Sequence, residues 1–139
     1  METRCEPAIL RVVPHRDPIL RLQRVVAADR ERATVAGAEP DGPGALPWER
    51  GAIEGLAQAA AVLLAQAFAV EDLPAEPRGM LVAVKRFVVA GAPPPGAEVH
   101  YHVELRRRFG PTAIVHGEAS CDGRRLAAGD LTLWSDQAR

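Results

Sequence analysis

The stretch GAIEGLAQAAAVLLAQAFAV, Gly51 to Val70, constrains the fold most strongly because it is almost wholly apolar. Its polar side chains are Glu54, Gln58 and Gln66. The stretch has about the minimum length of a membrane span, but its many alanines and its internal polar residues favour a helix buried within a folded protein. Its apolar residues cover more than one helical face, as expected for a helix surrounded by other elements.

Length, net charge and cysteine spacing narrow the class of protein that this sequence can encode. The 139 residues predict one domain, spanning residues 1–139, with a modest core. The net charge of -1 argues against a general nucleic-acid binder. Cys5 and Cys121 have neither metal nor redox-motif spacing, which predicts a reducing, cytoplasmic setting. The N-terminus carries Glu2 and Glu6 and has no apolar core of signal-peptide type.

Strand patterns flank the helix on both sides. Before it, a strand through Ile19 to Val26, a turn at AAD and a second strand at RATVAGA precede a loop, EPDGPGALPWER, that is rich in Pro and Gly. After it come a connector, EDLPAEPRG, and four strands, MLVAVKRFVVAG, AEVHYHVELRRR, TAIVHGEASC and RRLAAGDLTLWS. Asp122-Gly123 is a strong hairpin signal between the last two strands. The order predicts an α+β fold, an antiparallel β-sheet wrapped around one long central α-helix.

Four motifs carry a resemblance to a known family. They are VPHRDPILRLQRV, IEGLAQAAA, PPPGAEVHYHVEL and EASCDGRRLAAGDLTL. Together they resemble the hotdog fold of the β-hydroxyacyl-acyl-carrier-protein dehydratases, over most of the chain from about Val13 to Leu133. Within that family the sequence looks most like the short dehydratase-like subunits of aryl-polyene and related type II synthase pathways.

The resemblance implies a role for Glu54. Dehydration of a 3-hydroxyacyl thioester needs one base for the proton beside the carbonyl and one acid for the departing hydroxyl. The helix motif of the family gives Glu54 the position of the catalytic acid. We expect Glu54 in the first turn or so of the helix, where free N–H groups would stabilise the thioester oxygen. A helix-start charge favoured by the dipole is the structural alternative.

The resemblance also exposes a departure in the loop before the helix. The family carries its catalytic histidine there, in a Gly-His-Phe-Pro-type motif, whereas GAEPDGPGALPWER contains no histidine. Trp48 and Glu49 stand near the place of the Pro-Gly pair with which the family begins its helix. The base of the acid–base pair is therefore unassigned.

Four further residues are candidates near the helix. Gln58 follows Glu54 by four residues, so it shares the helical face and either orients the carboxyl or makes a structural hydrogen bond. His15, in the Pro-His-Arg motif, has a bracing role by resemblance and is a weaker candidate for a substitute catalytic group. Asp41 and Glu49 in the loop are alternative carboxylate bases, or solvated loop charges.

The remaining histidines and a basic run have simpler explanations. His100 and His102 share one strand face, and His116 is expected on a neighbouring strand. Zinc binding with Glu98 or Glu104 is one hypothesis, and the solvent-facing side of an antiparallel sheet is the simpler one. Arg106 to Arg108 either steer an acidic carrier protein or form a solvated strand end.

Three functions follow. The first is a 3-hydroxyacyl-acyl-carrier-protein dehydratase-like lyase of fatty acid or polyene-type synthesis, acting on acyl thioesters with Glu54 as the catalytic residue and Gln58 and His15 in support. The second is a non-catalytic partner subunit of a heterodimeric dehydratase, and the third is a hotdog acyl thioesterase. The resemblance implies a homodimer or a heterodimer with a related hotdog subunit. We expect no cofactor, metal, nucleic acid or membrane span.

Overall fold

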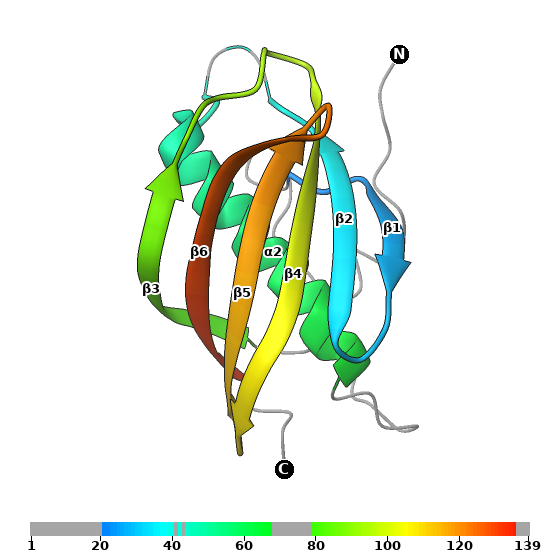
Figure 1. Ribbon diagram of the computed structural model, residues 1–139, viewed down its shortest axis with the longest axis vertical. Helices are drawn as coiled ribbons and strands as arrows, with labels where there is room; N and C mark the ends of the chain where they lie inside the picture. The colour runs from blue at the N-terminus through cyan, green and yellow to red at the C-terminus, as the bar shows by residue number, and fades with distance from the viewer. Residues whose placement is uncertain (1–20, 41, 43, 68–78, 136–139) are drawn as a thin grey trace.

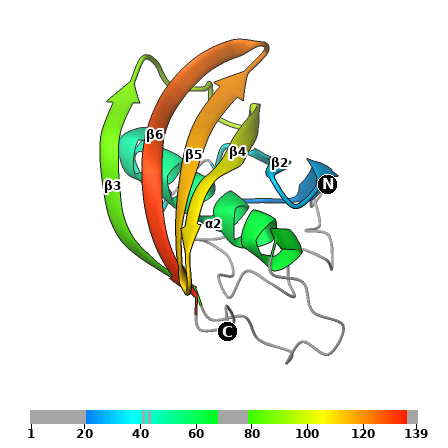
Figure 2. The same cartoon turned by 60° about the horizontal axis from the view of Figure 1, so that its bottom comes forward.

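The computed structural model describes residues 21–40, 42, 44–67 and 79–135. Seven elements follow the predicted order of two strands, a helix and four strands: β1 Arg24–Ala28, β2 Arg32–Ala38, α2 Trp48–Ala67, β3 Gly79–Val89, β4 Glu98–Phe109, β5 Thr112–Cys121 and β6 Arg124–Ser135. The six strands form one antiparallel sheet in the order β1-β2-β4-β5-β6-β3. The helix crosses one face of the sheet, which curves around it (Figures 1 and 2). The predicted α+β architecture is confirmed.

Alternating side chains explain the central strands. In β4, the side chains of Val99, Tyr101 and Val103 are buried against the helix, while the residues between them face outward. Strand β5 alternates between half-buried and buried residues along its whole length. The intervening turn to β6 falls at Asp122 and Gly123, whose φ angles of 50° and 76° fit the left-handed turn that this dipeptide favours.

The core lies between α2 and the concave face of the sheet. Leu56 and Leu63 of the helix are fully buried, as are Val115 of β5 and Leu131 of β6, which are paired across the two strands. Gly117 lets the helix approach closely, since a Cβ at that position would lie 2.9 Å from Cδ2 of Leu56. Within the described residues, no helix is both long and apolar enough to cross a membrane.

The first hairpin differs from its predicted bounds. Strand β1 runs through Ala28, so the turn comes later than AAD. The carboxylate of Asp29 accepts hydrogen bonds from the N–H groups of Glu31, at 2.7 Å, and Arg32, at 2.8 Å. These bonds stabilise the turn after the strand. Ile19 and Leu20 lie outside the described residues.

The helix begins earlier than predicted. Trp48 is its first residue, and the carbonyl of Pro47 accepts the N–H groups of Arg50, at 3.0 Å, and Gly51, at 2.8 Å. Glu54 therefore lies in the second turn, and the acidic residue of the first turn is Glu49. The expectation that Glu54 sits beside the free N–H groups of the first turn is wrong, because those groups belong to the first four residues. The last residues of the predicted helix, 68–70, and residues 71–78 of the predicted connector lie outside the described residues.

Candidate active site

Glu54 lies on the flank of α2 that faces away from the sheet. Its side chain is half-buried, like those of Ala57 and Ala61, which continue the same flank one and two turns later. Its carboxylate forms no hydrogen bond or ion pair with any residue that the structure describes. The carboxyl is therefore available to a group from outside the described part of the chain.

Gln58 holds the helix to the segment that enters β1. Its side chain is 1% exposed, and its Oε1 accepts the backbone N–H of Arg21 at 2.8 Å. This bond joins two points 37 residues apart in the chain. Gln58 thus forms the structural hydrogen bond that was one of its two predicted roles, and Arg21 is the partner. Its predicted effect on the orientation of the Glu54 carboxyl stays a prediction.

A buried polar cluster surrounds the start of the helix. Arg21 is 3% exposed, and its guanidinium forms an ion pair with Glu39 and donates from Nε to the hydroxyl of Tyr101 at 3.3 Å. Its Cζ lies 5.9 Å from the ring centroid of Trp48. We name these four residues the Arg21 cluster. They join the entry to β1, the end of β2, strand β4 and the first turn of α2.

Burial and pairing act in opposite directions on Arg21. Burial by itself lowers the pKa of the guanidinium, but the hydrogen bond to Glu39 and the contacts with Tyr101 raise that pKa overall. Burial raises the pKa of the Tyr101 hydroxyl. Arg21 is thus charged and Tyr101 neutral in the folded protein. The indole Nε1 of Trp48 is buried and has no acceptor among the described residues.

Two glycines make room for this cluster. A Cβ at Gly51 would collide with the guanidinium of Arg21, and a Cβ at Gly55 would collide with the ring of Tyr101. The glycines are four residues apart, so they lie on one helical face. The sequence reasoning missed the Arg21 cluster. The available signals were an arginine among apolar residues in ILRLQRV and these two helical glycines at a spacing of four.

Of the three candidate bases, the structure describes only Glu49. His15 and Asp41 lie outside the described residues. Glu49 is an exposed residue of the first helical turn, not a loop residue as predicted. The described part of the chain therefore assigns no partner base to Glu54.

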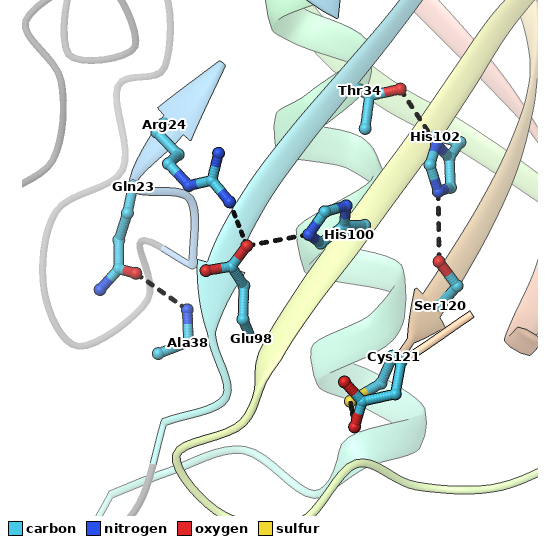
Figure 3. Close-up of polar contacts among 10 residues, drawn as sticks. Gln23, Arg24, Thr34, Ala38, Glu98, His100, His102, Ser120 and Cys121 are labelled. Carbon is cyan, nitrogen blue, oxygen red and sulfur yellow. Dashed lines mark hydrogen bonds and ion pairs between the residues drawn. The ribbon is translucent and has the colours of Figure 1, made fainter. Parts of the chain in front are cut away.

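The remaining histidines lie on the outward face of the sheet. Figure 3 shows His100 beside Glu98, at 2.8 Å, which also pairs with Arg24. His102 lies between Thr34, at 3.0 Å from Nδ1, and Ser120, at 3.2 Å from Nε2. The simpler of the two hypotheses, a polar outward face, is confirmed for these residues.

His116 has its own acidic partners on the same face. Its Nδ1 lies 2.8 Å from Asp130, and its Nε2 lies 3.4 Å from Glu118. No group of three or more His, Cys, Asp or Glu side chains within the described residues is arranged to hold a metal ion. Each of these histidines thus has its own hydrogen-bond partners on the outward face.

The basic run Arg106 to Arg108 lies at the exposed end of β4. The Nε of Arg106 lies 3.7 Å from Glu104, and the Cζ of Arg107 lies 4.7 Å from the ring centroid of Phe109. The run is therefore accessible, as both of its predicted roles require.

Comparisons with known proteins define the family. No protein-family model matches the sequence. The chain is 31% identical over 142 aligned positions to the 3-hydroxyacyl-(acyl-carrier-protein) dehydratase FabZ of Lactococcus lactis subsp. cremoris, with 90% of each protein covered. The resemblance noted in the sequence is thereby confirmed.

Solved structures share the fold. The dehydratase heterocomplex ApeI:P from Xenorhabdus doucetiae matches with a TM-score of 0.75 at 23% identity, covering 91% of this chain and 89% of the other. A hypothetical thioesterase with coenzyme A from Streptococcus pneumoniae matches with a TM-score of 0.65 at 9% identity, covering 84% and 87%. The chain has the hotdog fold and belongs to the FabZ-like 3-hydroxyacyl-(acyl-carrier-protein) dehydratase family.

Proposed function

We propose that this protein binds 3-hydroxyacyl groups held as thioesters on an acyl carrier protein, in fatty acid or polyene-type synthesis in the cytoplasm, and that Glu54 is its catalytic acid. The observation that carries the proposal is the setting of Glu54. It is a half-buried carboxyl on an otherwise apolar helix flank, and it has no partner within the described residues. Membership of the dehydratase family supports the class of reaction.

The reaction would proceed as a water elimination. A base removes the proton from C2, beside the thioester carbonyl, while Glu54 gives its proton to the C3 hydroxyl, which leaves as water. A double bond forms between C2 and C3, and the proton held by the base returns to Glu54 through solvent.

The base would come from a second chain. The segment from Gly37 to Arg50, which ends in the first turn of the helix, contains no histidine. Strands β1 and β3 are the edges of the sheet, and Val82 of β3 is 60% exposed. Edge strands offer unpaired backbone groups to a further strand. We propose that a second hotdog subunit, identical or related, binds this chain and completes the site.

A second candidate function is a non-catalytic subunit that stabilises an active dehydratase. The absence of a histidine from the loop before the helix favours it. In this case the Arg21 cluster would support the fold of the complex, and Glu54 would be dispensable for turnover. The two proposals differ in what replacement of Glu54 does to turnover by the complex.

The test is mass spectrometry of a 3-hydroxyacyl carrier protein incubated with the purified chain, alone and together with a co-purified hotdog homologue. Loss of the mass of one water, abolished by Glu54→Gln and retained by Glu49→Gln, supports the dehydratase. Glu49 is the matched control because it is an exposed carboxylate of the same helix. Turnover that needs the homologue and survives Glu54→Gln supports the non-catalytic subunit. Release of free carrier thiol without water loss would indicate the thioesterase and would overturn both.

A further inference from the structure

A groove of about 570 Å³ lies on the face of the sheet opposite the helix. In Figure 1 this face is turned toward the viewer, with α2 behind the strands. Its apolar surface includes Val88 of β3, Ile114 of β5 and Ala128 of β6. Val88 is 64% exposed and is the residue of β3 paired with Ala128. The volume falls within the usual range of small-molecule sites.

Three arginines from three different strands line this groove: Arg86 of β3, Arg106 of β4 and Arg125 of β6. Each stands at or next to a break in strand register. The breaks fall between Lys85 and Val88 in β3, between Leu105 and Arg107 in β4, and opposite Ala119 and Ser120 in β6. An extra residue in one strand re-aims the side chains beside it. Three separate bulges thus bring three guanidinium groups to one groove.

Arg86 is the most unusual of the three. Its φ angle of 55° lies in the left-handed region, which a long side chain rarely adopts. Next to it, Phe87 packs so closely on Gly129 that a Cβ there would lie 2.9 Å from the ring. Backbone strain of this kind persists where the surroundings enforce it and is frequent at binding sites.

The charges around the groove leave Arg86 unmatched. Arg106 pairs with Glu104, at 3.7 Å, and Arg125 pairs with Glu118, at 3.2 Å. The carboxylate that lines the groove, Asp130, lies 2.8 Å from Nδ1 of His116. Within the described residues Arg86 has no hydrogen bond or ion pair. One guanidinium without a carboxylate, beside an apolar surface, is complementary to a ligand with a single negative charge and an apolar part.

We infer that this groove binds an amphiphilic monoanion, an apolar chain that ends in a carboxylate. Arg86 binds the carboxylate as a fork of two N–H donors, and Val88, Ile114 and Ala128 contact the chain. Arg106 and Arg125, each paired with its own carboxylate, flank the groove and leave the charge of the ligand to Arg86. The site lies across the sheet from Glu54, so it is separate from the proposed acyl-thioester site and does not depend on it.

The probe for this site is decanoate, titrated into the isotope-labelled full chain below its micelle concentration and followed by two-dimensional NMR. Saturable shifts at Arg86, Val88 and Ala128 support the site. Acetate, which lacks the chain, and decanol, which lacks the charge, should each bind at least about ten-fold more weakly. Equal binding of decanol, tighter binding of decyl phosphate, or shifts confined to the flank around Glu54 would each overturn the inference.

Two variants separate binding from folding. Arg86→Gly removes the guanidinium and suits the left-handed φ, so it should weaken decanoate binding by about ten-fold or more while the melting temperature is retained. Lys85→Gln is the matched control, because Lys85 is the neighbouring exposed cation in the same bulge and does not line the groove. It should leave decanoate binding unchanged. Equal losses in the two variants would mean that general positive charge, and not the groove, attracts the probe.

Discussion

Arg21 and Glu39 form an ion pair that is almost wholly removed from solvent, with side chains 2% and 9% exposed. The pair joins the segment before β1 to the end of β2, and Arg21 also contacts Tyr101 and Trp48. A charge buried in this way is stable only while its partner is present. The start of α2, and with it the position of Glu54, therefore depends on a polar contact inside the core.

Loss of one partner of this pair should be costly. Arg21→Met leaves the Glu39 carboxylate buried without a cation, and we expect the free energy of unfolding to fall by about 3–5 kcal/mol. The double variant Arg21→Met/Glu39→Met removes both charges and should lose much less than the sum of the single variants. Chemical denaturation of the four proteins measures this coupling. Additive losses would show that the two side chains act independently.

Gly55→Ala should destabilise the protein even though alanine is the better helix former by about 1 kcal/mol. The added Cβ would collide with the Tyr101 ring, and such overpacking usually costs about 1–3 kcal/mol. In a Tyr101→Leu background the ring is gone, so the same substitution should be neutral or stabilising there. Thermal unfolding of the four proteins checks this. An equal cost in both backgrounds would rule out the collision as its cause.

Gln58→Leu should release the segment that enters β1. The backbone N–H of Arg21 would lose its acceptor inside the core, which costs about 1–3 kcal/mol, and its amide hydrogen should exchange faster. Gln23→Leu is the control, since Gln23 Oε1 accepts the N–H of Ala38 at 3.0 Å in a half-buried position (Figure 3). The control should affect the Ala38 amide and leave the Arg21 amide protected. Unchanged Arg21 exchange in Gln58→Leu would contradict the structural role.

His102 should make stability depend on pH. Burial lowers its pKa, and the nearby charge of His100 lowers it further, while Glu118 opposes the shift. The unfolded chain therefore binds the proton more readily than the folded protein. The contribution of His102 is fully present above the unfolded pKa of about 6.5 and is lost as the pH falls through the folded pKa. His102→Gln stays neutral, so its free energy of unfolding should fall less between pH 7 and pH 5.5, as measured by urea denaturation. An identical pH profile would show that His102 does not contribute.

Local patterns predicted most of the strands. The bounds Arg32–Ala38, Thr112–Cys121 and Arg124–Ser135 agree with the structure residue by residue. Alternation assigns the two faces of such strands, and Asp122-Gly123 defines the last hairpin, because both signals are local. The apolar length of the helix predicts its existence, but the sequence pattern places its first turn in the preceding loop. Trp48, Glu49 and Arg50 follow a run of Pro and Gly, and the bonds to Pro47 that start the helix have no sequence signature there.

Sequence patterns predict the order of elements, the two faces of the central strands and the presence of a carboxylate, Glu54, on the central helix. They do not predict that Arg21 is buried beside Glu39, that Gln58 binds the backbone of Arg21, or that Arg86, Arg106 and Arg125 line one groove. The two groups of features differ in the distance along the chain over which they arise. Periodicity and turn preference act over a few neighbouring residues, whereas buried ion pairs and strand bulges depend on partners that only the folded sheet brings together.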